Sequence, residues 1–587
     1  MRRKRLATVI ALGAVAALTL GACGDNAPPA GGSNGPAANN AGVGKIANPS
    51  SEKGGTLRYV NQDDWDSLDP ADTYYAYSWN FIRYYARQLV MFKSAPGGEG
   101  ATLVPDLATD LGTASPDNKT WTYHIRKGVK YEDGTEVKAQ DVKYDVERSL
   151  DKDTYPNGPT YFNDFLDLQG YTSPYKDSDP NKLGLKAIET PDDYTIIFHL
   201  KKPFAAFDYF AAIPSTAPVP PSKDTQTKYK DHVLSSGPYM FDQMNPGKSF
   251  TMKRNPHYDP ATAPTRPPAL PDRIEVQLKV TNSNDIDQRL MSGSADVDIA
   301  GSGVQPAAQA QILRDPALRA QTDSAITTRL WYSVINADVK PLDNIHCRKA
   351  IEWAVDKTNL QRAYGGSVGG DIATNMLPPV IPGAQQFDLY PTPDHKGDLN
   401  KAKEELKLCG HPDGGFSFNI SYRAGRDKEE ATAKSIAESL SKIGIKTELH
   451  NYPTGDYLKL YAGKPSFTKA NNIGIMVYGW AADWPDGFGF MAQIVDSRTI
   501  HQSGGNSNLG IKDPKIDQLI DSTLNEKDAA KRNSIWVEVD KQTMSDAYTI
   551  PGVWAKGLLY RPKNVTNVFV TDGFSEYDYL ALGTTNK

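Results

Sequence analysis

The residues best suited to chemistry lie in one short stretch, where two tryptophans flank a carboxylate. Trp480 precedes Asp483, Trp484 follows it directly, and Pro485 comes next. Two large aromatic rings beside one carboxylate suit a ligand with a positive head and an apolar body. The alternative is a buried strand that ends in a structural turn, with Asp483 capping the next segment. The stretch therefore predicts either a binding site or a turn.

The elements that would position this stretch follow from hydrophobic periodicity. An apolar, strand-like run leads to Gly479, where we expect the chain to break into a loop that holds both tryptophans. Strand–helix–strand alternation upstream predicts a parallel, right-handed unit, in which ligands bind beyond the carboxyl ends of the strands. Asp483 and Arg426 both lie just past such an end. The predicted strands are residues 416–422, 446–452 and 472–478, and the predicted helix is residues 428–443.

The first part of the chain shows similar patterns. Alternation of apolar and polar residues predicts strands, and apolar residues at helical spacing predict one helix. The predicted strands are residues 53–60, 120–126 and 194–200, and the predicted helix is residues 138–150.

The N-terminus has the pattern of an export signal. Residues 2–5 are basic, and the uncharged run 6–20 is shorter than the roughly 20 residues of a membrane span. The run ends in Leu-Gly-Ala-Cys23, which resembles a bacterial lipobox, so we expect residues 1–22 to be a signal peptide and Cys23 to be acylated. The alternative is an ordinary signal peptide with a chance cysteine. Residues 23–52, rich in Gly, Ala, Pro, Asn and Ser, predict a flexible tether.

Composition excludes some classes of protein. The formal charge is −5 and becomes −9 without the four basic signal residues, and no basic block follows, so we expect no nucleic-acid partner. Two cysteines remain, Cys347 and Cys409. In oxidising surroundings a disulfide between them is expected, and two buried free thiols are the alternative.

No motif predicts catalysis, a cofactor or a metal. The nine histidines are scattered, without a pair spaced to share a helix face, and the chain has neither H-E-x-x-H nor a Walker loop. We therefore expect a protein that is not an enzyme.

Four blocks in fixed order resemble the family 5 solute-binding proteins, the peptide- and oligopeptide-binding receptors of ABC importers. Together they span nearly all of the chain after the signal. The blocks are residues 105–142, residues 235–239 with 253–258, residues 347–357, and residues 480–486.

The resemblance implies an α/β fold of the periplasmic-binding-protein class (type II, cluster C), a two-lobed clamp with an extra inserted domain. Strands near Leu330 and Val553 would form the hinge. The implied boundaries are domain I at 53–90, 190–327 and 552–587, the inserted domain II at 91–189, and domain III, the second lobe, at 328–551.

The resemblance also implies the roles of individual residues. Asp483 matches the position that binds the ligand's α-ammonium group, and Arg426 is the candidate for the carboxylate end, with a solvated surface arginine as the alternative. Some relatives carry an arginine six residues before the aspartate, where this chain has Val477. The remaining ligand-binding candidates, for which core packing is the alternative, are Trp480, Trp484, Gly479, Trp65, Tyr75, Tyr77, Tyr239 and Gly237.

The function implied is a monomeric, lipid-anchored receptor on the extracytoplasmic face of the cell membrane. It would capture peptides, or similar amine-bearing solutes, by lobe closure and deliver them to the permease subunits of an ABC importer. The alternatives are a receptor of the same family for an oligosaccharide or a nickel complex, a signalling receptor, and a surface hydrolase.

Overall fold

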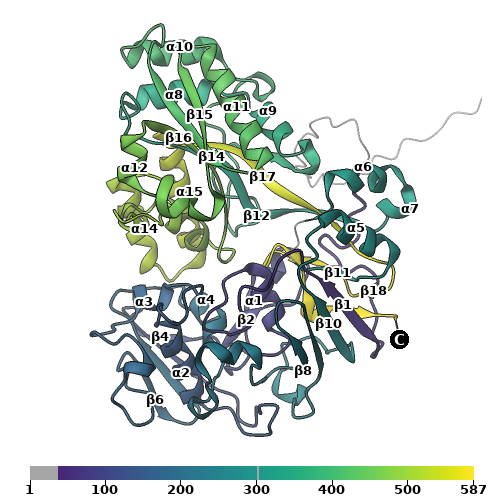
Figure 1. Ribbon diagram of the computed structural model, residues 1–587. Coiled ribbons are helices and arrows are strands. Elements are labelled where there is room, and N and C mark those ends of the chain that lie inside the picture. The colour runs from purple at the N-terminus through teal and green to yellow at the C-terminus, as the bar shows by residue number, and fades with distance from the viewer. Residues whose placement is uncertain (1–37, 300–302, 587) are drawn as a thin grey trace, which may run out of the picture. The chain divides into compact units, whose positions relative to one another are not determined.

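The computed structural model describes residues 38–299 and 303–586, and two groups of sheets organise them (Figure 1). The signal peptide and Cys23 lie outside the described residues. Two sheets belong to what we call the first lobe. One has the order β11-β1-β10-β9-β8 and the other β4-β5-β7-β6. Their strands are β1 (Thr56–Val60), β4 (Thr113–Ala114), β5 (Thr120–His124), β6 (Ile188–Asp192), β7 (Thr195–His199), β8 (Tyr239–Asn245), β9 (Ser249–Arg254), β10 (Arg273–Gln277) and β11 (Val297–Asp298).

Helices and short strands complete the first lobe. The helices are α1 (Ala76–Ile82), α2 (Ala139–Ser149), α3 (Tyr161–Phe165), α4 (Asp208–Ala211), α5 (Ser283–Ser292), α6 (Pro306–Arg314) and α7 (Pro316–Arg319). The short strands are β2 (Val90–Phe92), β3 (Leu103–Pro105), β18 (Val565–Thr566), β19 (Val570–Thr571), β20 (Glu576–Tyr577) and β21 (Gly583–Thr584). The C-terminal segment returns to this lobe, because Asn80 donates to the carbonyl oxygen of Tyr577 at 2.8 Å.

A six-stranded sheet, ordered β13-β17-β12-β16-β14-β15, forms the second lobe. Its strands are β12 (Thr322–Ile335), β13 (Gly370–Ile372), β14 (Ser417–Arg423), β15 (Lys446–Tyr452), β16 (Ile473–Ala481) and β17 (Thr549–Tyr560). Its helices are α8 (Ile345–Ala354), α9 (Lys357–Ala363), α10 (Leu399–Leu408), α11 (Asp427–Ser441), α12 (Pro465–Ala470), α13 (Gln493–Val495), α14 (Pro514–Leu524) and α15 (Ala529–Ser545).

The predicted strand–helix–strand unit is confirmed. Strand β14 pairs in parallel with both β15 and β16. Helix α11 connects β14 to β15 and buries Ala433, Ile436 and Leu440, which recur at helical spacing. Acidic residues lie in its first turn, where their negative charge interacts favourably with the positive end of the helix dipole.

Strand β16 is longer than predicted, and the expected loop at Gly479 is wrong. The strand runs on through Trp480 to Ala481, because β12 pairs with it in antiparallel fashion, with Arg329 opposite Ala481. This partner is distant in sequence, so local periodicity carried no sign of it.

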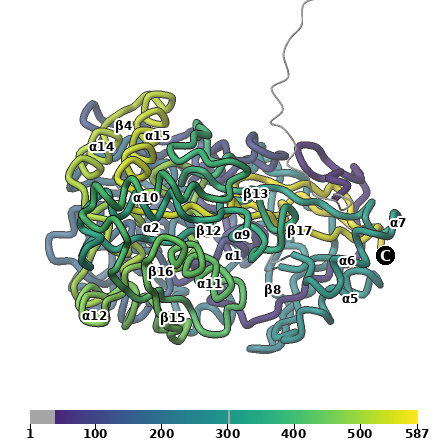
Figure 2. Tube along the Cα trace, turned by 90° about the horizontal axis from the view of Figure 1, so that it is seen from above, coloured from purple at the N-terminus to yellow at the C-terminus, as the bar shows by residue number. Residues whose placement is uncertain are grey.

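Two long strands join the lobes. Figures 1 and 2 both show β17 running from the six-stranded sheet toward α6 and α7 of the first lobe. Strand β12 pairs with it, and the register shifts between Ile326 and Leu330, beside the expected hinge at Leu330. The expected boundaries at 327/328 and 551/552 therefore fall inside continuous strands.

Two other predicted boundaries need correction. The boundary at 189/190 falls inside β6, and β7 pairs with both β5 and β6. This boundary therefore divides one sheet between two predicted domains. The predicted tether to residue 52 is too long, because residues 39–50 lie against the folded chain. The backbone N–H of Gly42 donates to Asp323 at 2.7 Å, and that of Ala47 donates to Val568 at 2.8 Å. A segment of flexible composition is ordered here by partners elsewhere in the chain.

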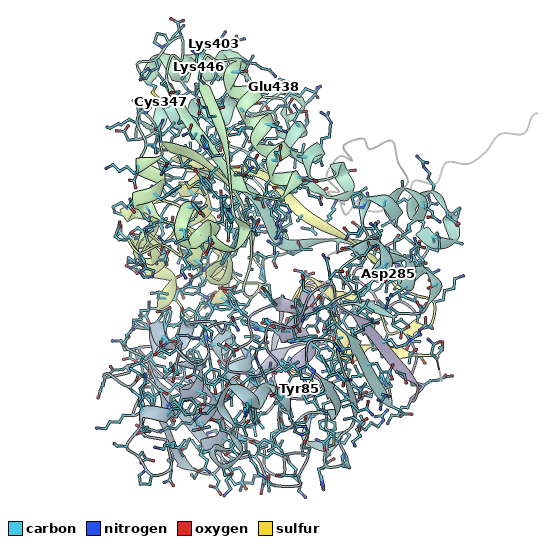
Figure 3. All side chains as sticks on the ribbon, in the orientation of Figure 1. Tyr85, Asp285, Cys347, Lys403, Glu438 and Lys446 are labelled. Carbon is cyan, nitrogen blue, oxygen red and sulfur yellow. A yellow bond between two sulfur atoms is a disulfide. The ribbon has the colours of Figure 1, made fainter. Side chains whose placement is uncertain are left out.

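The two cysteines expected to pair are joined by a disulfide. Cys347, labelled in Figure 3, lies on α8, and Cys409 directly follows α10, with 5.2 Å between their Cα atoms. The bridge links two helices of the second lobe.

Candidate ligand-binding site

Asp483 lies two residues past the end of β16 and meets two tyrosines of the other lobe. The hydroxyl of Tyr74 donates to one carboxylate oxygen at 2.9 Å, and the hydroxyl of Tyr161 donates to the other. Tyr161 begins α3, and the backbone N–H of Tyr74 is held by Asp66 at 2.7 Å. The site therefore combines three segments that are far apart in sequence.

The side chain of Asp483 is half-buried and has no cation beside it in the described part of the chain. Burial raises its pKa to about 6, against the opposing effect of the hydroxyls of Tyr161 and Tyr74. Among residues 38–299 and 303–586, no Lys, Arg or His side chain pairs with it. A carboxylate has about four acceptor sites, so the two hydroxyls leave room for further donors. The arrangement suits a ligand group that is both a cation and a hydrogen-bond donor.

The two flanking tryptophans have different environments. Trp480 is half-buried at the end of β16, and its indole Nε1 has no hydrogen-bond partner in the described part of the chain. Trp484 is only 1% exposed, and its ring lies 4.7 Å from that of Tyr161 and 6.1 Å from that of Phe488. Aromatic packing encloses the ring of Trp484, so its position does not support the prediction that it walls the site. It instead supports the tyrosine that holds Asp483.

Gly479 serves packing. A Cβ atom at this position would lie 2.2 Å from the ring of Trp331 on the neighbouring strand β12. The missing side chain lets this indole lie across β16, so the prediction of direct ligand contact by Gly479 is not supported by its position.

The first-lobe candidates divide into exposed and buried residues. Tyr75 is 56% exposed and stacks on Tyr77, with 5.4 Å between ring centroids. Trp65 packs edge-on against Tyr77 and Phe81. Tyr239 is fully buried and donates to the carbonyl oxygen of Pro271 at 2.7 Å.

The buried position of Tyr239, with its hydroxyl used inside the core, does not support the prediction that it binds ligand. Gly237 is also a packing residue, since a Cβ there would lie 2.6 Å from the carbonyl oxygen of Tyr84. Tyr75 and Tyr77 stay candidates at the surface of the first lobe.

Arg426 is the residue preceding α11, and its side chain is exposed. No carboxylate of the described residues pairs with it. Arg423, at the end of β14, donates from Nε to Glu429 at 2.9 Å, and its guanidinium lies over the ring of Tyr478 at 5.2 Å. Arg426 thus stays available for an anionic ligand group.

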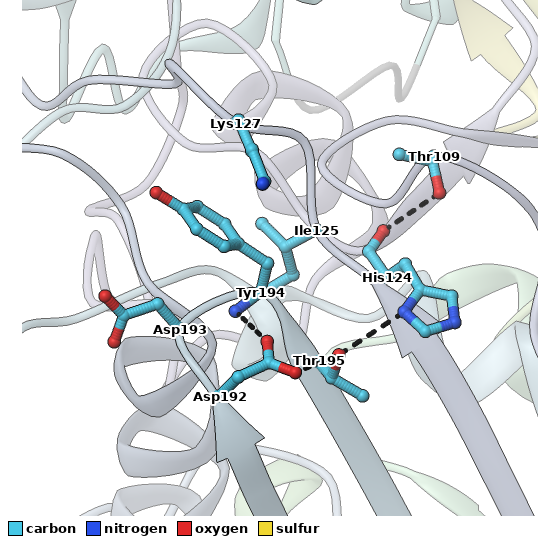
Figure 4. Close-up of a pocket in the computed structure, with 8 residues that line it drawn as sticks. All are labelled: Thr109, His124, Ile125, Lys127, Asp192, Asp193, Tyr194 and Thr195. Atoms are coloured by element: carbon cyan, nitrogen blue, oxygen red, sulfur yellow. Dashed lines mark hydrogen bonds between the residues drawn. The ribbon is translucent and has the colours of Figure 1, made fainter.

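Two cavities are not lined by Asp483 itself, although one of them reaches Tyr161. One, of about 800 Å³, borders the four-stranded sheet and contains none of the predicted site residues (Figure 4). Asp192 there accepts from the backbone of Tyr194 at 2.8 Å and from Thr195 at 2.9 Å. The lining residues are Thr109, His124, Ile125, Lys127, Asp192, Asp193, Tyr194 and Thr195.

The second cavity, of about 760 Å³, is lined by residues of both lobes, including Tyr161, Lys202, Phe488 and Arg498. No group of three or more His, Cys, Asp or Glu in residues 38–299 and 303–586 is arranged to hold a metal ion. Within the same residues, none of the helices has the length and apolarity needed to cross a membrane.

The sequence did not identify the tyrosines that hold Asp483. Tyr74 lies in an aromatic-rich segment, but Tyr161 lies in a short helix with no distinctive pattern. Only the contact between the lobes shows that these two tyrosines bond to Asp483. Arg329 on β12, whose neighbours also come from distant segments, was missed for the same reason.

The two-lobed fold, with the carboxylate of Asp483 held between the lobes, is typical of a solute-binding protein. Residues 102–502 match the bacterial extracellular solute-binding proteins, family 5 middle. The chain belongs to this family, whose members bind solutes.

Individual relatives agree with this assignment. The chain is 26% identical to the probable D,D-dipeptide-binding periplasmic protein DdpA of Escherichia coli, covering 82% of this chain and 85% of the relative. It is also 26% identical to di/tripeptide-binding protein 1 of Pseudomonas aeruginosa, covering 80% and 83%.

Solved structures show the same fold. Clavulanic acid biosynthesis oligopeptide binding protein 2 is 40% identical, with a TM-score of 0.89, and the match covers 94% of this chain and 99% of that one. The periplasmic binding protein DppA of Helicobacter pylori, in complex with the peptide STSA, has a TM-score of 0.68 at 23% identity, covering 91% and 99%. The expected type II binding-protein fold is confirmed.

Proposed function

We propose that this protein is an extracytoplasmic receptor that captures short peptides, or similar amine-bearing solutes, between its lobes. The observation that carries the proposal is the carboxylate of Asp483, which is enclosed between lobes and lacks a cation. The α-ammonium group of a peptide supplies a positive charge and three donors. The peptide-binding names of the relatives in both comparisons support the same ligand class.

Lobe closure couples binding to selectivity. Asp483 belongs to the second lobe, and Tyr74 and Tyr161 belong to the first, so closure removes the carboxylate from water. An unpaired charge makes this step costly, whereas a bound ammonium group compensates the charge. Trp480, Tyr75 and Tyr77 offer apolar surface for ligand side chains, and Arg426 offers a cation for the carboxylate end.

Delivery to an ABC importer and attachment through an acylated Cys23 complete the proposal. The membership of the family and the periplasmic relatives support delivery, and the lipobox-like residues 20–23 support attachment. In this scheme the acyl chains, rather than a protein helix, keep a monomeric receptor beside its permease.

Isothermal titration of the soluble protein with dialanine and trialanine tests the ligand class. N-acetylation of the peptide and Asp483→Asn each remove the proposed charge pair, so each should lower affinity by roughly 10- to 100-fold. Asp413→Asn, an exposed carboxylate in the same lobe, is the matched control and should leave affinity unchanged. Oligosaccharide binding without peptide binding would refute the peptide assignment, and turnover of a ligand would establish a hydrolase.

A further inference from the structure

A second charged side chain, Arg329 of β12, lies near the candidate site. Arg329 lies opposite Ala481 of β16, two residues before Asp483. Its guanidinium lies over the indole of Trp331 at 5.2 Å, and this indole stacks on the ring of Tyr364 at 5.0 Å. One face of the guanidinium is therefore supported by an aromatic platform, while its N–H edge stays free to donate.

Arg329 has no counter-ion in the part of the chain that the structure describes. No carboxylate pairs with it, and no protein acceptor bonds to its guanidinium. Burial lowers its pKa, with further lowering by the charges of Arg423 and Arg426 nearby. Of these three arginines, only Arg423 has a carboxylate partner, Glu429. The charge of the half-buried Arg329 is thus uncompensated, which is costly until an anion binds.

The charges of Arg329 and Asp483 both act on the side chain of Tyr478. Tyr478 lies on β16, and the pKa of its hydroxyl is lowered by Arg423 and Arg329 and raised by Asp483, with burial as the largest effect. Arg329 and Asp483 are separated by one strand spacing across the sheet and two residues along it. If the chain stays extended past Ala481, their Cα atoms lie roughly 8 Å apart.

We propose that Arg329 binds the carboxylate of the ligand whose ammonium group lies at Asp483. This inference rests on the proposed function and adds the second anchor and the ligand length. The planar guanidinium can donate two parallel bonds to a carboxylate, which a lysine cannot. Since an extended peptide spans about 3.5 Å per residue, the two anchors select a zwitterion of about one to three residues. Arg329 thus takes the place of Arg426 as the direct partner of the carboxylate, and Arg426, exposed just before α11, adds positive charge at the rim.

Titration of wild-type protein and Arg329→Met with trialanine, its C-terminal amide and its N-acetyl form tests the inference. Amidation should weaken binding to wild type by roughly 10- to 100-fold. Arg329→Met should weaken binding of the free acid by a similar factor and leave the amide unaffected, and Arg329→Lys should be intermediate. The matched control is Arg362→Met, since Arg362 is exposed on α9 and bonds only Asn359.

Equal affinity of the acid and the amide for wild type, or equal loss of both in Arg329→Met, overturns the carboxylate anchor. If amidation matters and N-acetylation does not, the Asp483 anchor fails and the Arg329 anchor stands. If wild-type protein binds tetra-alanine as tightly as trialanine, the proposed limit on ligand length is overturned.

A measurement without peptide separates binding from a structural role. Because the charge of Arg329 is uncompensated, Arg329→Met should leave the melting temperature of the free protein unchanged or raise it. A lowered melting temperature, with Arg362→Met unaffected, would assign the guanidinium to the fold and overturn the inference. If no peptide binds, thermal protection by succinate in wild type and not in Arg329→Met supports the anion site, and its absence refutes it.

Discussion

Acidification should weaken ligand binding through Asp483. Its pKa is about 6 in the ligand-free protein, raised by burial from the usual 3.8. The protonated carboxyl group is neutral and cannot pair with an ammonium group, so the ligand binds the ionised form. Affinity should therefore be full above pH 6 and decline as the pH falls through this value.

The magnitude follows from the fraction of ionised Asp483. At pH 7.5 nearly all of it is ionised, and at pH 5.0 about one tenth is, so affinity falls about 10-fold, or about 1.4 kcal/mol. The hydroxyls of Tyr161 and Tyr74 lower the pKa. Their replacement by phenylalanine should therefore move the midpoint above pH 6.

Titration calorimetry with a dipeptide between pH 5.0 and 7.5 measures this dependence, with Asp483→Asn as the reference. The asparagine variant should bind weakly and show no change with pH in this range. A flat profile for the wild type, or the same decline in Asp483→Asn, would refute the assignment of the titrating group.

The disulfide, a close strand contact and the anchor give further predictions. Replacement of Cys347 and Cys409 by serine should lower the free energy of unfolding by roughly 4 kcal/mol, because the bridge closes a loop of 62 residues. Denaturant titration measures this change. Detection of two thiols in the unreduced, unfolded wild type would contradict the pairing. Gly479→Ala should cost about 1–3 kcal/mol, since the added methyl overlaps an indole, whereas Gly455→Ala, with open space around it, is the control. Equal effects of the two would be evidence against the overlap. Cys23→Ala should shift the protein from membranes to the soluble fraction, and unchanged sedimentation with membranes would exclude acylation as the anchor.

The local sequence pattern was sufficient to predict the positions of several helices and strands of the second lobe. The period of apolar residues located α11 and the flanking strands to within about two residues, because α11 and β14 each bury apolar residues and β15 alternates between exposed and half-buried ones. The same reasoning failed at Gly479, where a strand from another part of the chain extends β16. Periodicity measures burial within a segment and carries no information about such a partner.

The site was only partly predictable for a related reason. Asp483 was identified through a short motif, whereas Tyr161 and Arg329 acquire their roles by facing a different lobe or strand. Tyr239 has the composition of a ligand-binding residue, yet its hydroxyl bonds a backbone carbonyl group in the core. Residue type states what a side chain is able to do, and the tertiary structure decides whether it faces a ligand.

The contact between the two ends of the described chain constrains the order of folding. Asn48 donates to the carbonyl oxygen of Val565 at 3.1 Å across a sequence separation of 517 residues. During synthesis, the first lobe therefore waits for nearly the last residues before it can be completed, whereas the disulfide and the strand–helix–strand unit of the second lobe lie within one continuous stretch. Contacts of such high sequence separation form slowly. The lobe made first is thus completed only after nearly the last residues have been synthesised.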